Sequence, residues 1–186
     1  MPATILIASI IPGTGNVLSN GGAIMQRAKI IETDLTFRGL NNRRVTDMIV
    51  IHHTGTPTDD DLSAHEIHES HRAQGWAGIG YHYVVRKDGS IERGRPHWTI
   101  GAHAVGENSH TIGIHVSGNF EVGQPTDKQI EALAMLLGTI CYEYQLPIDS
   151  DHVVGHRDLM ATACPGENLY NILQTVRGKA IWYQQN

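Results

Sequence analysis

The chain has 186 residues, which is long enough for one well-buried domain and short for two. Hydrophobic residues make up 40% of it and charged residues 18%, a composition that is typical of a folded domain and excludes a disordered chain. The formal net charge of −5 argues against a nucleic-acid partner, because proteins that bind nucleic acid need a basic face.

The first 24 residues differ from the rest, since they carry no charge and contain many glycine, serine and asparagine residues. Their apolar run at 5–11 is far shorter than the roughly 20 residues of a transmembrane helix, so we expect no membrane span. The run is similar to the core of an export signal, but the basic leading region is missing, which leaves the export route open. We expect residues 1–27 to be an appendage on a domain that covers residues 28–183. The apolar side chains of this arm should pack across that domain or onto a neighbouring copy, which would make a homo-oligomer.

The first half of the predicted domain contains strands and one helix. Residues 47–53 (DMIVIHH) form a short apolar run with β-branched residues, which indicates a buried strand. Residues 63–75 begin with the Ser and Glu spacing of a capping box and end at a glycine, which predicts a helix. An Asp-Gly pair inside 81–95 predicts a hairpin, and the run 111–120 predicts another buried strand.

The second half continues the alternation. Thr126 opens a helix whose apolar positions have helical spacing, and Pro147 prevents its continuation. Residues 152–156 form a last short strand. Pro165 is expected to begin a final helix that Gly178 ends. Strands alternating with helices predict an α/β fold, a single domain with a largely buried central sheet.

Two cysteines are too few for a disulfide scaffold, and their settings differ. Cys141 falls on the apolar face of a predicted helix, where a free cysteine behaves as a small hydrophobic residue. Cys164 lies just before Pro165, at the positive end of a predicted helix dipole, which favours a thiolate. A thiolate in that place would be either a nucleophile or a metal ligand.

Two histidines are candidates to lie beside this thiol. His156 ends the strand 152–156, and the loop 157–163 can fold back to bring Cys164 beside it. His52 lies at the end of the strand 47–53. Two imidazoles and a thiolate would be three ligands for a tetrahedral zinc ion, with the fourth position left for water, as in catalytic zinc sites.

The 12 histidines of the chain include a helical cluster at His65, His68 and His71. Their spacing of three differs from the H-E-x-x-H pattern of zinc proteases, in which the two histidines are four apart. We interpret this cluster as a polar helix face near a cleft rather than as a second metal site.

Four motifs, in this order along the chain, resemble those of the zinc-dependent N-acetylmuramoyl-L-alanine amidases. This family includes amidases of the phage-lysozyme type and the peptidoglycan recognition proteins of animals. The motifs are VIHHTGT (50–56), GWAGIGYHYVVRKDGSIERGRP (75–96), GAHAVGENSHTIGIHVSGNF (101–120) and GHRDLMATACPGENLYNIL (155–173). The resemblance implies a central mixed sheet flanked by helices, with a groove that holds one zinc ion.

The resemblance also implies roles for single residues. His52, His156 and Cys164 match the zinc ligands of the family, and Tyr81 matches its catalytic tyrosine. Thr162 falls where some members carry lysine and the recognition proteins carry threonine. A lysine would offer an oxyanion a full charge, whereas Thr162 offers one neutral hydrogen bond.

The implied reaction is hydrolysis of the amide bond between N-acetylmuramic acid and the L-alanine of the stem peptide by a zinc-activated water. Tyr81 would orient the water or donate a hydrogen bond to the developing oxyanion, with help from Thr162. His53, His103 and Asn108 are candidates to line the substrate groove, and each is equally well explained as a structural residue.

The implied partner is peptidoglycan or its soluble muropeptides, with action at the cell wall in the periplasm, outside the cell or as a phage endolysin. One alternative is a peptidoglycan-binding receptor on the same fold without catalysis, but such members typically lack the cysteine that Cys164 supplies here. A second alternative is a metal-free Cys/His hydrolase with Cys164 as the nucleophile. The sequence does not distinguish diaminopimelate from lysine stem peptides.

Overall fold

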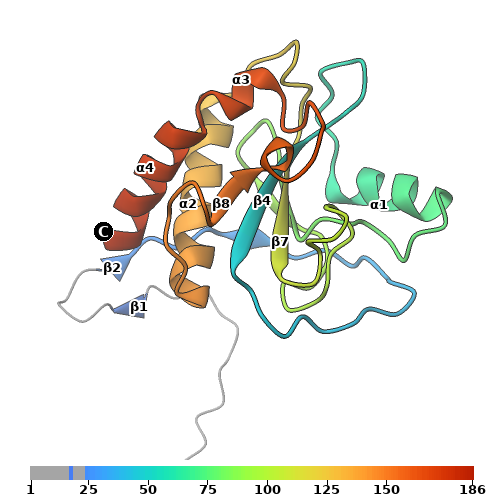
Figure 1. The fold of residues 1–186 in the computed structure, drawn as a ribbon, viewed down its shortest axis with the longest axis horizontal. Helices are drawn as coiled ribbons and strands as arrows, with labels where there is room; N and C mark the ends of the chain where they lie inside the picture. The colour runs from blue at the N-terminus through green and yellow to red at the C-terminus, as the bar shows by residue number, and fades with distance from the viewer. Residues whose placement is uncertain (1–16, 19–23) are drawn as a thin grey trace, which may run out of the picture.

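The computed structural model describes residues 17–18 and 24–186. Its centre is a six-stranded sheet with the strand order β3-β6-β5-β7-β4-β8 (Figure 1). In this sheet β5 and β6 pair antiparallel, and the other neighbouring strands pair parallel. The strands are β3 (Ile30–Ile31), β4 (Met48–His53), β5 (Tyr83–Val85), β6 (Ile91–Arg93), β7 (Thr111–Val116) and β8 (Val153–Gly155). The predicted α/β fold with a mixed central sheet is confirmed.

Helices cover both faces of this sheet. They are α1 (Ala64–Ala73), α2 (Asp127–Tyr144), the short α3 (Glu167–Tyr170) and α4 (Leu173–Gln185), with a 3-10 turn η1 (His156–Asp158) after β8. Helices α2 and α4 lie side by side on one face, and α1 lies on the other (Figure 1). The capping boxes expected at the starts of α1 and α2 are both present.

The two faces of the sheet have different characters. One face packs against α2 and α4 and forms the main hydrophobic core, to which β4 and β7 contribute Ile49, Ile51, Ile112, Ile114 and Val116. Since side chains alternate along a strand, His52 and His115 lie on the opposite face. The parallel register places these two histidines directly beside each other. The α1 face of the sheet therefore combines a small apolar cluster with buried imidazoles.

The C-terminal helix differs from the expectation. The segment after Pro165 forms two helices, α3 and α4, and α4 runs through Gly178 to Gln185. Gly178 faces open space, while Leu173, Val176 and Ala180 are buried in the core shared with α2. Burial of this face outweighs the roughly 1 kcal/mol that glycine costs in a helix, so the expectation that Gly178 ends the helix is wrong.

Two other predicted boundaries shift slightly. The strand expected over 111–120 ends at Val116, because the chain then turns through Gly118, whose φ is +139°. The hairpin predicted within 81–95 is present as β5 and β6, with Gly89 at its turn at a φ of +87°.

The N-terminal arm is only partly described. Strands β1 (Val17–Leu18) and β2 (Ile24–Met25) pair antiparallel as a separate two-stranded ribbon. The apolar run at 5–11 lies outside the described residues, so its packing stays a prediction. The chain already contacts the domain before residue 28, because β2 lies against α4 and the Arg27 guanidinium lies 5.7 Å from the ring centroid of Tyr142 on α2. The Ala28 N–H then donates to Thr139 Oγ1 on α2 at 2.9 Å. None of the helices in the described part of the chain has the length and apolarity that a bilayer crossing needs.

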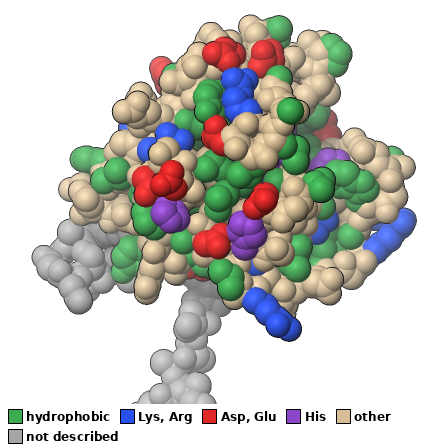
Figure 2. Space-filling model, in the orientation of Figure 1, with side chains coloured by type: hydrophobic (Ala, Val, Ile, Leu, Met, Phe, Trp, Pro, Cys, Tyr) green, Lys and Arg blue, Asp and Glu red, His purple; other side chains and the backbone are tan. Residues whose placement is uncertain are grey.

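Surface charges of opposite sign are mixed. On the face drawn in Figure 2, lysine and arginine side chains are scattered among acidic ones rather than gathered into one patch. Arg157, for example, lies 2.7 Å from a Glu167 carboxylate oxygen and 3.4 Å from one of Glu121. Positive charge is therefore neutralised locally at such pairs.

Candidate active site and metal centre

Two strand ends place the histidines of the candidate site. The parallel register of β4 and β8 pairs Ile51 with Gly155, so the next residue on each segment, His52 and His156, come side by side. Their ring centroids are 4.4 Å apart. The carboxyl ends of parallel strands meet at one edge of a sheet, and open α/β sheets bind their ligands outside that edge.

The loop after η1 returns Cys164 to the same place. The Arg157 N–H donates to the Cys164 carbonyl at 2.8 Å, and the Arg157 guanidinium donates to the Ala163 carbonyl at 2.6 Å. The His53 backbone N–H donates to Cys164 Sγ at 3.4 Å, which aims the sulfur at the end of β4. The loop therefore folds back as the sequence predicts.

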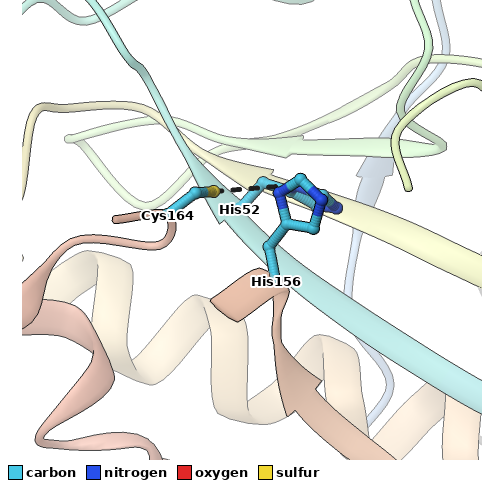
Figure 3. A group of neighbouring side chains, drawn as sticks. All are labelled: His52, His156 and Cys164. Carbon is cyan, nitrogen blue, oxygen red and sulfur yellow. Dashed lines mark hydrogen bonds between the residues drawn. The ribbon is translucent and has the colours of Figure 1, made fainter. Parts of the chain in front are cut away.

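The three side chains point toward one another (Figure 3). One possible ligand atom each of His52, His156 and Cys164 lie within 4.8 Å of one another. The separation of His52 Nδ1 and Cys164 Sγ is 3.6 Å. The buried Nε2 of His156 has no hydrogen-bond partner among the described residues. One sulfur and two imidazole nitrogens are a donor set that suits zinc.

Burial sets the protonation of these groups. It lowers the pKa of His52 well below its usual value, with further lowering by the neighbouring rings of His103 and His156. It also lowers the pKa of His156. Both imidazoles are therefore neutral at neutral pH and keep a lone pair for a metal.

The cysteine behaves differently from the expectation. Burial raises the pKa of the Cys164 thiol to about 12, although the His53 N–H and the Arg157 charge act in the opposite direction. The expected help from a helix dipole is small, because α3 begins only at Glu167 and has four residues. The prediction that this dipole favours a thiolate is wrong, and a bound cation is the group that would make Cys164 lose its proton.

The second nitrogen of His52 is also held. His52 Nε2 lies 2.9 Å from Nδ1 of His103. The backbone N–H groups of His103 and Ala104 donate to Asn108 Oδ1 at 2.8 and 3.0 Å. Asn108 therefore fixes the turn that carries His103, and His103 contacts a candidate ligand directly.

Tyr81 lies in the same cluster of rings. Its ring centroid is 5.1 Å from that of His52 and 5.0 Å from that of His115. No hydrogen bond from the described residues engages its hydroxyl. Burial raises the pKa of Tyr81 above its usual value near 10, and Cys164 adds to the effect, so the hydroxyl stays protonated at neutral pH.

Thr162 lies within the returning loop. The Cys164 backbone N–H donates to Thr162 Oγ1 at 3.2 Å. Because this bond uses a lone pair of the hydroxyl oxygen, the hydroxyl proton remains available as a donor.

The sequence of this chain is similar to those of known proteins. A family model described as N-acetylmuramoyl-L-alanine amidase matches residues 41–167. The endolysin of Klebsiella phage KP32 is 33% identical over 132 residues, which cover 68% of this chain and 85% of that protein. The N-acetylmuramoyl-L-alanine amidase of Homo sapiens is 34% identical over 136 residues, which cover 68% of this chain and 23% of that protein.

A solved structure is also similar. The endolysin amidase LysCS of Clostridium intestinale matches with a TM-score of 0.74 and 35% sequence identity, over 81% of this chain and 96% of that one. The chain belongs to the N-acetylmuramoyl-L-alanine amidase family. The predicted enzyme class is thereby confirmed.

Two of the three histidines of α1 hold backbone that leads into the candidate site. His65 is exposed, whereas His68 is buried and accepts the Ile79 N–H at 3.2 Å through Nδ1. His71 accepts the Gly80 N–H through Nδ1 at 3.0 Å. Two of the three therefore hold the backbone just before Tyr81, so the interpretation of a polar helix face fits His65 alone.

His53 is turned away from its neighbour. Its Nδ1 accepts the Phe120 N–H at 3.1 Å, and its side chain is on the α2 and α4 side of the sheet by strand alternation. Only the backbone N–H of His53 reaches the candidate metal site. Its groove role stays a prediction that no contact supports.

Sequence reasoning missed one buried residue that lies beside the candidate site. His115 is buried beside His52, and its Nε2 lies 3.1 Å from Thr54 Oγ1, which also accepts the Gly118 N–H at 3.1 Å. The sequence signal that could have indicated it is the place of His115 in a predicted buried strand. The parallel pairing of β4 and β7 then brings His52 and His115 together.

Proposed function

We propose that this amidase hydrolyses the bond between N-acetylmuramic acid and L-alanine of the stem peptide, with one zinc ion held by His52, His156 and Cys164. The observation that carries the proposal is the convergence of three donor atoms within 4.8 Å at the ends of β4 and β8. Two imidazoles and one thiolate occupy three positions of a tetrahedral zinc ion, which leaves the fourth position for water or substrate.

The chemistry that a zinc ion supplies when bound is Lewis acidity and a water whose pKa is lowered to about 7. The chain supplies neutral imidazoles from His52 and His156, so these two ligands need no deprotonation. The His53 N–H donates to the sulfur of Cys164 and would stabilise it as a thiolate.

Tyr81 and Thr162 are proposed as hydrogen-bond donors to the oxyanion that develops on the substrate carbonyl. The raised pKa of Tyr81 suits a donor and not a general base. The hydroxyl of Thr162 is oriented by the Cys164 N–H, which leaves its proton free. A neutral threonine supplies less charge stabilisation than the lysine of some relatives.

The two rival functions are less well supported. A receptor that only binds peptidoglycan has no need of a half-buried cysteine and a free tyrosine hydroxyl beside two convergent histidines. In a metal-free Cys/His hydrolase the nucleophile must be a thiolate, whereas Cys164 is half-buried in a setting that raises its pKa and favours the thiol.

We propose peptidoglycan or its soluble muropeptides as the substrate and the cell wall as the place of action. This proposal rests on the family and on its phage endolysin members. The groove of the catalytic domain would then recognise the substrate.

The test is to measure zinc content and release of stem peptides from purified cell wall for the wild type and three variants. His52→Ala, His156→Ala and Cys164→Ala should each lose most of the bound zinc and the activity, because a catalytic zinc site has three protein ligands. The matched controls are His65→Ala, an exposed histidine, and Cys141→Ala, a core cysteine, and both should keep zinc.

A chelator should abolish release, and added zinc should restore it. A ligand variant with stoichiometric zinc and normal turnover would show that the assignment at that position is wrong. Stem-peptide release that survives complete removal of metal would favour the cysteine nucleophile. Retention of zinc and wall binding without any release would favour the receptor.

A further inference from the structure

We propose that His103 is a positioning residue that holds His52 in one tautomer, with the proton on Nε2 and the lone pair of Nδ1 free for a metal. This proposal rests on the proposed function, because the tautomer of His52 decides which ring nitrogen can bind a metal, and Nδ1 is the one that faces Cys164.

The direction of the hydrogen bonds fixes the positions of the protons. Thr111 Oγ1 donates its single proton to the Glu107 carbonyl at 2.8 Å. The same oxygen lies 3.3 Å from His103 Nε2, so it can only accept there, and His103 Nε2 must carry a proton. In a neutral His103 ring Nδ1 is then an acceptor, and the His52 Nε2–H donates to it across 2.9 Å.

The ring of His103 is held in place by a close-fitting cavity. A Cβ atom on Gly113 would lie 2.5 Å from His103 Cδ2 and Cγ, and one on Gly101 would lie 2.5 Å from His103 Cδ2. Glycine at both positions leaves room for the imidazole between β7 and the start of its own loop. With the backbone of His103 bonded to Asn108, the ring has one position and one orientation.

The consequence lies at the other side of the His52 ring. With Nε2 protonated, Nδ1 presents its lone pair toward Cys164 Sγ, 3.6 Å away. The opposite tautomer would place a proton between the two ligand atoms. Metal-binding histidines usually fix their tautomer by donating to a carboxylate or a carbonyl, and here an imidazole nitrogen takes that part.

The first measurement is the ring nitrogen shifts of His52 in metal-free, 15N-labelled wild-type protein at a pH where the ring is neutral. The proposal requires a protonated Nε2 and an unprotonated Nδ1 in His52. A His52 ring that is mainly protonated on Nδ1, or an even mixture of both forms, would overturn the proposal without any variant.

The second measurement is zinc affinity by competition with a chelator, in three variants. His103→Leu keeps the bulk and removes the acceptor, and it should weaken zinc binding by about tenfold to a hundredfold, the usual effect of losing a partner of a metal ligand. His103→Asn offers an amide oxygen near the position of Nδ1 and should recover much of the loss. The control His65→Leu changes an exposed histidine on α1 and should leave the affinity unchanged.

These results separate positioning from folding. An unchanged zinc affinity in His103→Leu, or equal losses in His103→Leu and His103→Asn, would show that the acceptor at His103 has no role. If His103→Leu does not fold, the ring shifts of the wild type still decide. If the wild type binds no zinc while His52 has the required tautomer, the proposed metal site fails and the positioning of His52 by His103 stands.

Discussion

Tyr81 lies among the rings of the site with a protonated hydroxyl that no described residue engages. Tyr81→Phe removes only this hydroxyl, so the ring packing against His52 and His115 remains. We expect the variant to keep zinc and fold but to hydrolyse the amide roughly a hundredfold more slowly, the scale for losing one oxyanion donor.

The matched control is Tyr142→Phe, because Tyr142 is exposed on the outer side of α2. Turnover numbers on a muropeptide, together with zinc content, provide the comparison. A Tyr81→Phe enzyme with wild-type turnover would make Tyr81 a packing residue.

Much of the candidate site can be predicted at the level of single residues, and the rest shows why sequence patterns are insufficient. His52, His156 and Cys164 converge as expected, because strand ends and a small-residue loop are local features. The thiol pKa of Cys164 could not be predicted, since burial by distant segments sets it. The partner of His52 depends on the register of β4 and on the loop that carries His103, and neither is encoded in nearby residues.

At the scale of elements, the ends of β4 and β8 bring the candidate ligands together. The helix pair α2 and α4 packs against one face of the sheet and forms the main core. The starts of α1 and α2 follow from capping boxes of four residues, and the structure has both of them. The length of α4 does not follow from its sequence, because contact with α2 decides whether a helix continues past Gly178.

Two glycines of this helix pair should respond to alanine in opposite ways. Gly178 lies inside α4 and faces open space, so Gly178→Ala should stabilise the fold by about 0.5–1 kcal/mol. A Cβ on Gly138 of α2 would lie 2.9 Å from the Ala180 carbonyl oxygen of α4, so Gly138→Ala should separate the helices and cost about 1–3 kcal/mol.

Urea unfolding of the two variants and the wild type measures both effects. Zinc content should be the same in all three, because neither glycine contacts the site. Equal shifts of the same sign would contradict the helix packing described here.

At the scale of the whole molecule, the sheet separates an apolar core from a face that holds buried histidines. The residues that build the site run from β4 to the loop before α3. Contacts with this domain begin before residue 28, from β2 to α4 and from Arg27 to Tyr142. The division into an appendage at 1–27 and a catalytic domain at 28–183 stays our proposal.

Deletion of residues 2–24 tests this division. We expect zinc binding and hydrolysis of small muropeptides to stay within a few-fold of the full chain. Solubility or oligomeric state should change, because the deletion removes the apolar residues of the arm and exposes the surface that they cover. Light scattering on both proteins at equal concentration measures the oligomeric state. Loss of zinc or of muropeptide hydrolysis in the shortened chain would show that the arm belongs to the site.

The competing view of the arm is a cleaved export signal. Mass spectrometry of the protein recovered from its native host separates the two views. An intact N-terminus supports an arm, and a mature start near residue 20–28 contradicts it.

The central claim is that His52, His156 and Cys164 hold one zinc ion, and X-ray absorption at the zinc edge of the purified protein tests it most directly. The account predicts one sulfur at about 2.3 Å and two imidazole nitrogens at about 2.0–2.1 Å, with one further light ligand from water. Cys164→Ala should remove the sulfur contribution, and Cys141→Ala should leave it unchanged. A zinc shell of the wild-type protein without sulfur, or a protein that takes up no zinc, would contradict the account.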